Sequence, residues 1–347
     1  MAKINLLNGK IIGDFEKPYI VAELNTSHFG DLEIAYKMIQ SSKDSGCNCV
    51  KFQSWTPDTL YSKTYYNENP IARRFINKFS LSQSDLKQLS DFASDLDIDF
   101  ASTPYSIEEA EFLVEKCNIP YIKIASMELN NLPYLKELAY LKVPLVLSTG
   151  MGTLSEIKEA VDTIVSTGNT KLIILHCTSV YPSNAKIVNL NNILSLRKLF
   201  PTHPIGFSDH TIGIEVSLAS ISLGACMLEK HFTLDNSKIG MDNQMAIQPN
   251  EIQRMVNSCK NVFDAMGSNE RILSDEEISQ IPNMRRSIVS KRFIKAGEVL
   301  SINDLTLKRP GNGLPPSYIN KIIGLKTNKN IDQDCIILKE DIVDFLK

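Results

Sequence analysis

Two patterns of hydrophobic and polar residues alternate along the chain. Short, almost continuously apolar runs that end in polar residues are separated by longer stretches with apolar residues at helical spacing. Runs of this kind are typical of parallel strands that are buried on both faces. The eight runs are YIVAEL (19–24), CNCVKFQ (47–53), IDFAST (98–103), YIKIAS (121–126), PLVLST (144–149), KLIILHCT (171–178), PIGFSDH (204–210) and ACMLEKHF (225–232).

Start signals for helices lie between these runs. Ser106-x-x-Glu109 and Thr153-x-x-Glu156 are capping boxes followed by apolar residues at helical spacing, and Asp31 can cap a further helix. Eight strands, each followed by a helix, predict an α/β fold of the (β/α)8 TIM barrel type. The alternative is a doubly wound sheet, which usually has a glycine-rich phosphate loop after its first strand, and no such loop is present here.

Three further segments complete the predicted organisation. Residues 4–12 form a β-hairpin with its turn at Asn8-Gly9. The connection over residues 54–81 is unusually long, and a loop of that length tends to be functional or mobile. After Pro282 the composition shifts toward β-branched residues and glycine turns. We therefore predict a barrel domain over 1–282 and a compact appended module over 283–347, which is small for an independent core and leans on the barrel or on another subunit.

Composition and charge narrow the class of protein. The 347 residues are 43% hydrophobic and 22% charged, with a formal net charge of −3, which argues against a nucleic-acid-binding polycation. No apolar run approaches the roughly 18 residues that a membrane helix needs, and the first residues do not resemble a secretion signal. Seven scattered cysteines indicate reduced thiols. The chain is predicted to be a cytoplasmic protein without membrane or nucleic-acid partners.

Polar residues gather at the C-terminal ends of the predicted strands, where a barrel places its active site. Two of them are lysines at the same depth, and a lysine is costly to bury without an anionic partner. Two ammonium groups with several hydroxyls suit a ligand that carries phosphate and carboxylate. The polar residues are Glu23, Lys51, Gln53, Thr103, Lys123, Ser126, Glu128, Ser148, Thr178, Ser179, Tyr181, Ser208, Asp209, His210, Glu229 and His231.

His210 and His231 end the seventh and eighth strands. Because neighbouring strands lie about 4.8 Å apart, the two imidazoles could share one divalent cation such as Mn²⁺ or Mg²⁺, with water and substrate as the remaining ligands. The alternative is that each histidine is hydrogen-bonded inside the core. Glu23 and Glu128 could act as general acid or base or orient metal-bound water; the alternative for each is a salt bridge to a lysine. Tyr181 could reach a sugar hydroxyl or lie buried with its own hydroxyl bonded.

Several motifs resemble those of the sialic acid synthase family, which includes N-acetylneuraminate, legionaminate and pseudaminate synthases. They run in family order from about residue 20 to residue 313, and the tail after Ser287 is similar to the family's antifreeze-like (SAF) module. The motifs are AELNTSHFGD, VKFQ, STPYS, YIKIASMELNN, LSTGM, LHCTSVYP, GFSDHTIG, EKHFTLD and KRPGNG.

The resemblance implies a TIM barrel in a domain-swapped homodimer. It also implies a transferase that condenses phosphoenolpyruvate with an open-chain N-acylated hexosamine of the N-acetylmannosamine type. The products are a nonulosonic acid, which is a nine-carbon 3-deoxy-2-keto acid, and phosphate. The implied cofactor is a divalent metal, Mn²⁺ first, with Mg²⁺ or Co²⁺ as alternatives.

The resemblance also implies roles for individual residues. His210 and His231 would bind the metal, with Glu23 acting near it. Arg309 would reach the partner subunit's site and contact the N-acyl group. The residues that would hold phosphoenolpyruvate are Lys51, Thr103, Lys123, Ser126, Ser148 and Ser208. Those that would hold the sugar are Gln53, Tyr181 and Asp242.

Three positions depart from the family pattern: Ser27 and Ser179 each replace an asparagine, and Asn243 replaces a histidine. All three touch substrate pockets, so the sugar stays open. One alternative is a related phosphoenolpyruvate-dependent 3-deoxy-2-keto sugar acid synthase that uses a phosphorylated or non-acylated sugar. Another is a non-catalytic carbohydrate-binding protein that keeps the fold, although binding alone does not require the carboxylates, lysines and histidines together.

Overall fold

The structure is a computed structural model that describes residues 1–345. The chain divides after Gly267 into two compact units. The predicted boundary after residue 282 lies within helix α13 (Asp275–Met284), which belongs to the second unit.

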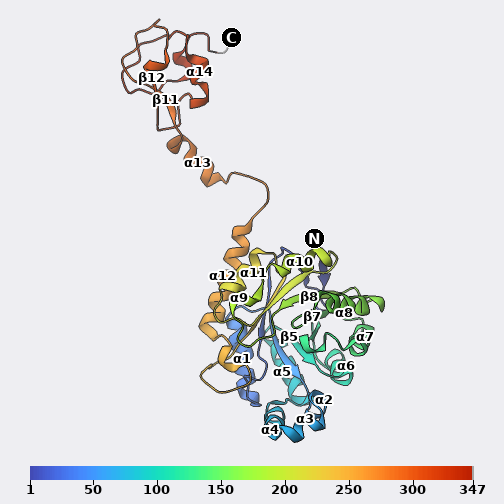
Figure 1. Cartoon of the computed structure of the whole chain (residues 1–347). Helices are drawn as coiled ribbons and strands as arrows, with labels where there is room; N and C mark the ends of the chain where they lie inside the picture. Colours follow the sequence, from blue (N-terminus) through green and yellow to red (C-terminus); the bar gives the residue numbers. More distant parts are fainter. Residues whose placement is uncertain (346–347) are drawn as a thin grey trace. The chain divides into compact units, whose positions relative to one another are not determined.

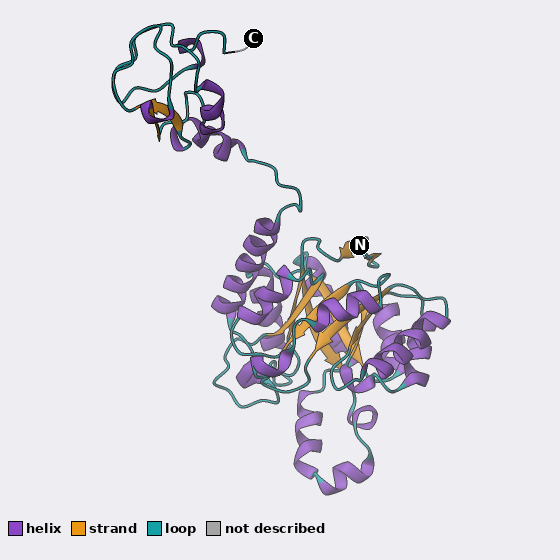
Figure 2. Ribbon diagram, turned by 45° about the horizontal axis from the view of Figure 1, so that its top comes forward, coloured by secondary structure: helices purple, strands orange, loops and turns teal. Residues whose placement is uncertain are grey.

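The first unit is built on a closed barrel of eight parallel strands (Figure 2). One strand lies in each predicted apolar run, and the eighth pairs with the first to close the barrel, which confirms the predicted TIM-type fold. The strands are β3 (Tyr19–Glu23), β4 (Cys49–Ser54), β5 (Asp99–Pro104), β6 (Ile122–Ile124), β7 (Leu145–Ser148), β8 (Leu172–Cys177), β9 (Ile205–Asp209) and β10 (Met227–His231).

Helices surround the barrel (Figure 1). The predicted caps are present, because Ser106 and Thr153 form capping boxes and Asp31 accepts hydrogen bonds from the first turn of its helix. The helices are α1 (Leu32–Asp44), α5 (Gln83–Asp95), α6 (Ile107–Lys116), α7 (Leu132–Tyr140), α8 (Leu154–Ser166), α9 (Ala185–Val188), α10 (Asn192–Leu199), α11 (Glu215–Ser222) and α12 (Pro249–Met266), with short 3-10 turns at Ser126–Glu128 and Asn243–Met245.

Strand alternation separates the barrel interior from its outer layer. Outward side chains such as Phe52, Phe207 and Leu228 pack in the large hydrophobic cluster that includes the helices. Inward side chains fill the lower barrel with a second apolar cluster, whose barrel members are Tyr19, Val21, Cys49, Ala101, Tyr121, Val146, Ile173, Leu175 and Met227. The next inward position toward the C-terminal end of most strands is polar, so the interior changes from a packed core to a lined cavity.

Two other segments differ in detail from the prediction. The N-terminal hairpin is present, with strands β1 (Lys3–Asn5) and β2 (Ile11–Gly13). The long connection after β4 is not a plain loop, since it holds α2 (Pro57–Leu60), α3 (Lys63–Glu68) and α4 (Pro70–Phe79). Helices α2 and α3 are too short for a clear periodic pattern, whereas α4 has Ile76 and Phe79 buried on one face. The three helices pack on a small cluster with Trp55, Tyr66, Ile76 and Phe79 at its centre.

The second unit contains α13 and the antiparallel strands β11 (Ser287–Ser290) and β12 (Leu305–Lys308). It also contains α14 (Ile319–Ile322) and 3-10 turns at Ile302–Asp304, Pro316–Tyr318 and Lys339–Asp341. The unit has a hydrophobic cluster of its own, made of Ile288, Ile294, Leu300, Leu305, Leu314, Ile322, Ile331, Ile337 and Ile342. Across residues 1–345, no helix combines the length and apolar character needed to cross a membrane.

Candidate active site

A cavity of about 330 Å³ opens at the C-terminal ends of the barrel strands. It brings together all but four of the side chains that the sequence singled out, the exceptions being Glu128, Thr178, Asp209 and Arg309. Those lining it are Glu23, Lys51, Gln53, Thr103, Lys123, Ser126, Ser148, Ser179, Tyr181, Ser208, His210, Glu229, His231 and Asp242. Residues distant in sequence meet here because parallel strands place their carboxyl ends at one face of the barrel.

Glu128 and Arg309 lie elsewhere. Glu128 ends the 3-10 turn after β6 and accepts a hydrogen bond from Asn131 Nδ2 at 2.8 Å, and it is not among the residues that line the cavity. The turn carries Ser126 to the cavity and directs Glu128 away from it. Arg309 follows β12 in the second unit, and its contact with a partner subunit stays a prediction.

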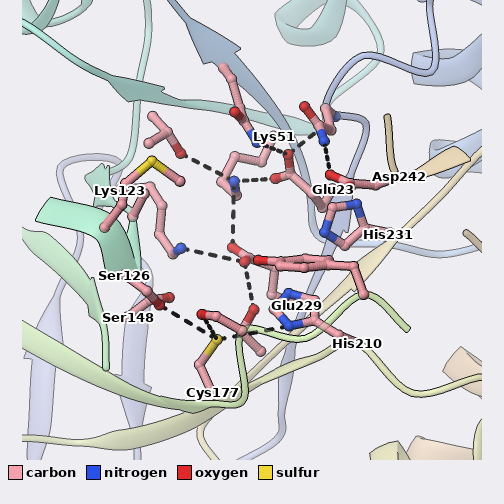
Figure 3. A pocket seen from close by; sticks show the side chains of 18 of the residues that line it. Glu23, Lys51, Lys123, Ser126, Ser148, Cys177, His210, Glu229, His231 and Asp242 are labelled. Atoms are coloured by element: carbon pink, nitrogen blue, oxygen red, sulfur yellow. Dashed lines mark hydrogen bonds and ion pairs between the residues drawn. The ribbon is translucent and has the colours of Figure 1, made fainter. Parts of the chain in front are cut away.

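Two buried lysines and two buried glutamates form the floor of the cavity (Figure 3). The Lys51 ammonium makes an ion pair with Glu23, lies 3.7 Å from Glu229 Oε2 and donates to Thr103 Oγ1 at 3.2 Å. The Lys123 ammonium lies 3.4 Å from Glu229 Oε1. Glu229 thus bridges both lysines. The salt bridge that was the alternative for Glu23 exists, and it is part of the cavity wall.

The two lysines of this cluster do not receive equal shares of its negative charge. Burial alone would raise the pKa of Glu229, but the two ammonium groups outweigh burial and lower it to about 2. Burial and the charge of Glu229 raise the pKa of Glu23 in spite of Lys51. Burial, together with the charge of Lys51, lowers the pKa of Lys123, although Glu229 acts in the opposite direction. Lys123 is therefore the ammonium that gains most from an additional anion.

His210 and His231 lie side by side, with ring centroids 5.4 Å apart. The Nδ1 atom of His210 lies 2.8 Å from the Thr178 carbonyl oxygen. A carbonyl only accepts, so Nδ1 carries a proton. Burial would lower the pKa of His210, but its contact with Cys177 and the hydrogen bond to the Thr178 carbonyl outweigh burial and raise it. Burial and the neighbouring His210 hold the pKa of His231 well below its usual value, so this imidazole is neutral. The ring of Tyr181 packs on His210 at a centroid distance of 4.2 Å.

The two imidazoles fit a divalent cation with an incomplete protein shell. Metal binding requires a neutral imidazole with a free nitrogen. His231 is neutral, and His210, whose Nδ1 is bonded to the Thr178 carbonyl, would supply Nε2 by releasing a proton when the metal binds. In residues 1–345 no group of three or more His, Cys, Asp or Glu side chains is arranged to hold a metal ion. A cation at His210 and His231 would therefore take its other ligands from water and substrate, which is an arrangement of a catalytic site and not of a closed structural one.

Sequence reasoning gave no role to several residues that line the cavity. Glu229, two positions before His231 and on the same inner face, was predicted to lie at the strand ends, but it was given no role of its own. Asn25 donates through Nδ2 to Asp242. Cys177 accepts a hydrogen bond from Ser126 Oγ at 3.6 Å. The aromatic part of the wall is Trp55, Tyr61 and Tyr105, and only the position of the single tryptophan in the long connection hinted at it.

Asn243 supports the cavity wall without lining it. Its side chain is fully buried, and Nδ2 donates to the carbonyl oxygens of Asp235 and Lys238 at 2.8 Å each. These bonds close the loop that presents Met241 and Asp242 to the cavity. The departure from the family pattern at position 243 thus acts on loop shape.

Comparison with known proteins agrees with this fold. The profile of the NeuB family matches residues 38–271, and that of the SAF domain matches residues 285–343. The chain is 37% identical to the N,N'-diacetyllegionaminic acid synthase of Legionella pneumophila, over 93% of this chain and 94% of that protein. It is 33% identical to the human N-acetylneuraminate-9-phosphate synthase, over 97% and 96% of the two chains.

A solved structure of the N-acetylneuraminic acid synthetase of Leptospira borgpetersenii, in complex with citrate, is also similar. It superposes with a TM-score of 0.73 at 29% identity and covers 80% of this chain and 95% of that one. The chain belongs to the NeuB family of sialic acid synthases. The predicted enzyme class, a phosphoenolpyruvate-condensing transferase, and the predicted SAF domain are confirmed.

Proposed function

We propose that the enzyme joins phosphoenolpyruvate to the aldehyde of an open-chain N-acylated hexosamine and so makes a nonulosonic acid and phosphate. One observation carries the proposal: at the floor of an open cavity, the buried Lys123 ammonium has one carboxylate partner within the described residues, Glu229, and shares it with Lys51, which also pairs with Glu23. A buried lysine is costly without a full anionic partner. Lys123 therefore leaves room for an anionic ligand.

The residues around Lys123 match the two anionic ends of phosphoenolpyruvate. Ser126, Ser148 and Thr103 supply hydroxyls to the same part of the cavity. The Ser148 hydroxyl is buried, and no hydrogen-bond partner is found for it within the described residues. A buried hydroxyl that lines a cavity and has no partner in the protein is explained by a hydrogen bond to a ligand oxygen. Glu229 would keep both ammonium groups facing the cavity when no anion is bound.

The reaction forms one carbon–carbon bond and requires three proton transfers. C3 of phosphoenolpyruvate attacks the aldehyde carbon of the sugar, and the aldehyde oxygen takes up a proton as the bond forms. Water then adds to C2 and gives up a proton. Finally the bond between C2 and the phosphate oxygen breaks while the new C2 hydroxyl becomes the ketone, and the departing phosphate takes up the hydroxyl proton. We assign the first two transfers to Glu23, because burial and the charge of Glu229 raise its pKa in spite of Lys51 and so favour the protonated form, which can give the first proton and, once ionised, take the second.

We also propose that His210 and His231 hold a divalent cation, Mn²⁺ in the first instance. When bound, it would polarise the sugar aldehyde and stabilise negative charge on its oxygen. The chain's own contribution is to orient that oxygen beside the two rings. Tyr181, which packs on His210, and Gln53, which donates to Glu23 at 3.3 Å, would contact the sugar hydroxyls.

Product analysis tests the proposed reaction. The enzyme is incubated with phosphoenolpyruvate and one sugar at a time: N-acetylmannosamine, its 6-phosphate, a 2,4-diacetamido-2,4,6-trideoxyhexose, and unacylated mannose as control. We expect phosphate release and a keto acid whose mass is that of the sugar plus pyruvic acid, with kcat/KM highest for an unphosphorylated N-acyl sugar. Turnover of mannose or of the 6-phosphate alone would favour the alternative synthase, and no turnover of any sugar would contradict the proposal.

A further inference from the structure

A buried ion pair lies on the outer face of the barrel, directly behind the two histidines. Lys230 and Asp209 each expose 1% of their surface, and they are opposite one another in the ladder between β10 and β9. Each precedes a cavity histidine in sequence, and strand alternation directs it to the opposite face. Neither side chain lines the cavity, so neither can touch a substrate.

The Lys230 ammonium is bonded to both sequence neighbours of His210. It donates to Asp209 Oδ2 at 2.9 Å and to the carbonyl oxygen of Thr211 at 2.5 Å. Lys230 is itself the residue before His231. The Lys230 ammonium therefore links the backbone of β10, which carries His231, to the residues on both sides of His210.

The remaining bonds of the pair reinforce this link. Asp209 Oδ1 accepts from the Thr211 backbone N–H and from its hydroxyl, at 2.8 Å each. Asp209 Oδ2 also accepts from the Ser217 hydroxyl of α11 at 2.5 Å. On the inner face, the Thr178 carbonyl fixes the ring of His210. The position of His210 is thus held from both faces of the barrel wall.

Stability alone gives a weak reason for this pair. The adjacent outward positions on the same two strands, Phe207 and Leu228, are apolar and belong to the hydrophobic core. Replacing a buried ion pair by apolar side chains is often neutral or stabilising, because desolvation offsets the Coulomb attraction. An apolar pair would not supply a directional hydrogen bond between the two strands at the level of the histidines.

We propose that Lys230 is a positioning residue that sets the separation and orientation of His210 and His231 for their cation. The inference rests on the proposed metal role of these histidines. Ligand distances at a metal are held within about 0.2 Å, so a link that fixes both strands at this level acts directly on affinity. Groups that orient metal ligands typically contribute 10- to 100-fold in metal affinity.

Two variants separate positioning from stability. Lys230→Met leaves the Asp209 carboxylate buried and unpaired, and we expect it to lower the melting temperature. The double variant Asp209→Asn/Lys230→Met removes both charges and should recover most of that loss. The matched control is Asp14→Asn, which breaks the buried pair of Asp14 with Arg197 at the N-terminal end of β9, far along the strand from His210.

The readouts are Mn²⁺ affinity by calorimetry on metal-free protein and crystal structures of the metal-free forms. For the double variant we expect Mn²⁺ affinity to fall by about 10- to 100-fold and the two rings to shift apart or rotate, with the melting temperature near that of the wild type. The control should lose thermal stability and keep its affinity. Wild-type affinity and ring geometry in the double variant would overturn the inference. If the wild type itself binds no Mn²⁺, the metal role fails, and the ring positions in the two crystal structures still decide whether Lys230 positions the pair.

Discussion

Lys123→Met is expected to lower kcat/KM for phosphoenolpyruvate by at least about 100-fold, with a raised KM, while the barrel stays folded. Lys123 is the ammonium with the smaller share of the available negative charge, and burial, together with the charge of Lys51, lowers its pKa. A bound phosphate or carboxylate would stabilise it directly. In the variant that interaction is lost for both substrate and transition state.

The fold should tolerate this change because Glu229 keeps other partners. Its carboxylate still lies 3.7 Å from the Lys51 ammonium and accepts from Ser208 Oγ at 2.9 Å. A matched control is Lys10→Met, which removes an ion-paired lysine from the N-terminal hairpin, where it contacts Asp99 at the start of β5. Steady-state kinetics and melting temperatures of the two variants give the comparison. Equal kcat/KM in Lys123→Met and wild type would remove Lys123 from the substrate site.

Removal of divalent cations with EDTA is expected to abolish product formation, and added Mn²⁺ to restore it. His231→Ala should lose Mn²⁺ binding and lower kcat by at least about 100-fold, with little loss of stability, because the ring is not hydrogen-bonded to any described residue. Mn²⁺ binding is measured by electron paramagnetic resonance, from the concentration of Mn²⁺ that remains free in solution.

The control for the histidine variant is His203→Ala. His203 is also buried, but it lies just before β9, at the opposite end of that strand from His210. The His203→Ala variant should bind Mn²⁺ as the wild type does. Full turnover in the presence of excess chelator would exclude a metal from the reaction and would leave the imidazole pair to act through hydrogen bonds alone.

The barrel and the depth of its polar layer could be predicted because both follow from strand alternation. A strand buried on both faces is apolar except where it lines a cavity, so Lys51 and Lys123 in otherwise apolar runs marked one level of the barrel. The same reasoning placed His210 and His231 together. The lengths of the strands and the order of the runs along the chain were sufficient to place these residues together. No knowledge of side-chain packing was needed for that prediction.

The sequence could not show how the charges are shared. That Glu229 bridges both lysines depends on distances across three strands, which no spacing along the chain encodes. Glu128 illustrates the converse, since a 3-10 turn directs its side chain away from the cavity although it follows a strand end. The three helices after β4 were missed: α2 and α3 span only 4 and 6 residues, and α4, although amphipathic, has no side-chain cap such as the one that marked α6.

A crystal structure of the enzyme soaked with phosphoenolpyruvate is the sharpest test of whether Lys51 and Lys123 bind this substrate. We expect the ligand to lie on the cavity floor, with its phosphate and carboxylate bonded to Lys123 and Lys51. A ligand oxygen should be within hydrogen-bond distance of Ser148 Oγ, and C3 should face the side of the cavity formed by His210 and His231. Density for the ligand at another place on the protein, with the two ammonium groups still paired only to Glu23 and Glu229, would contradict this expectation.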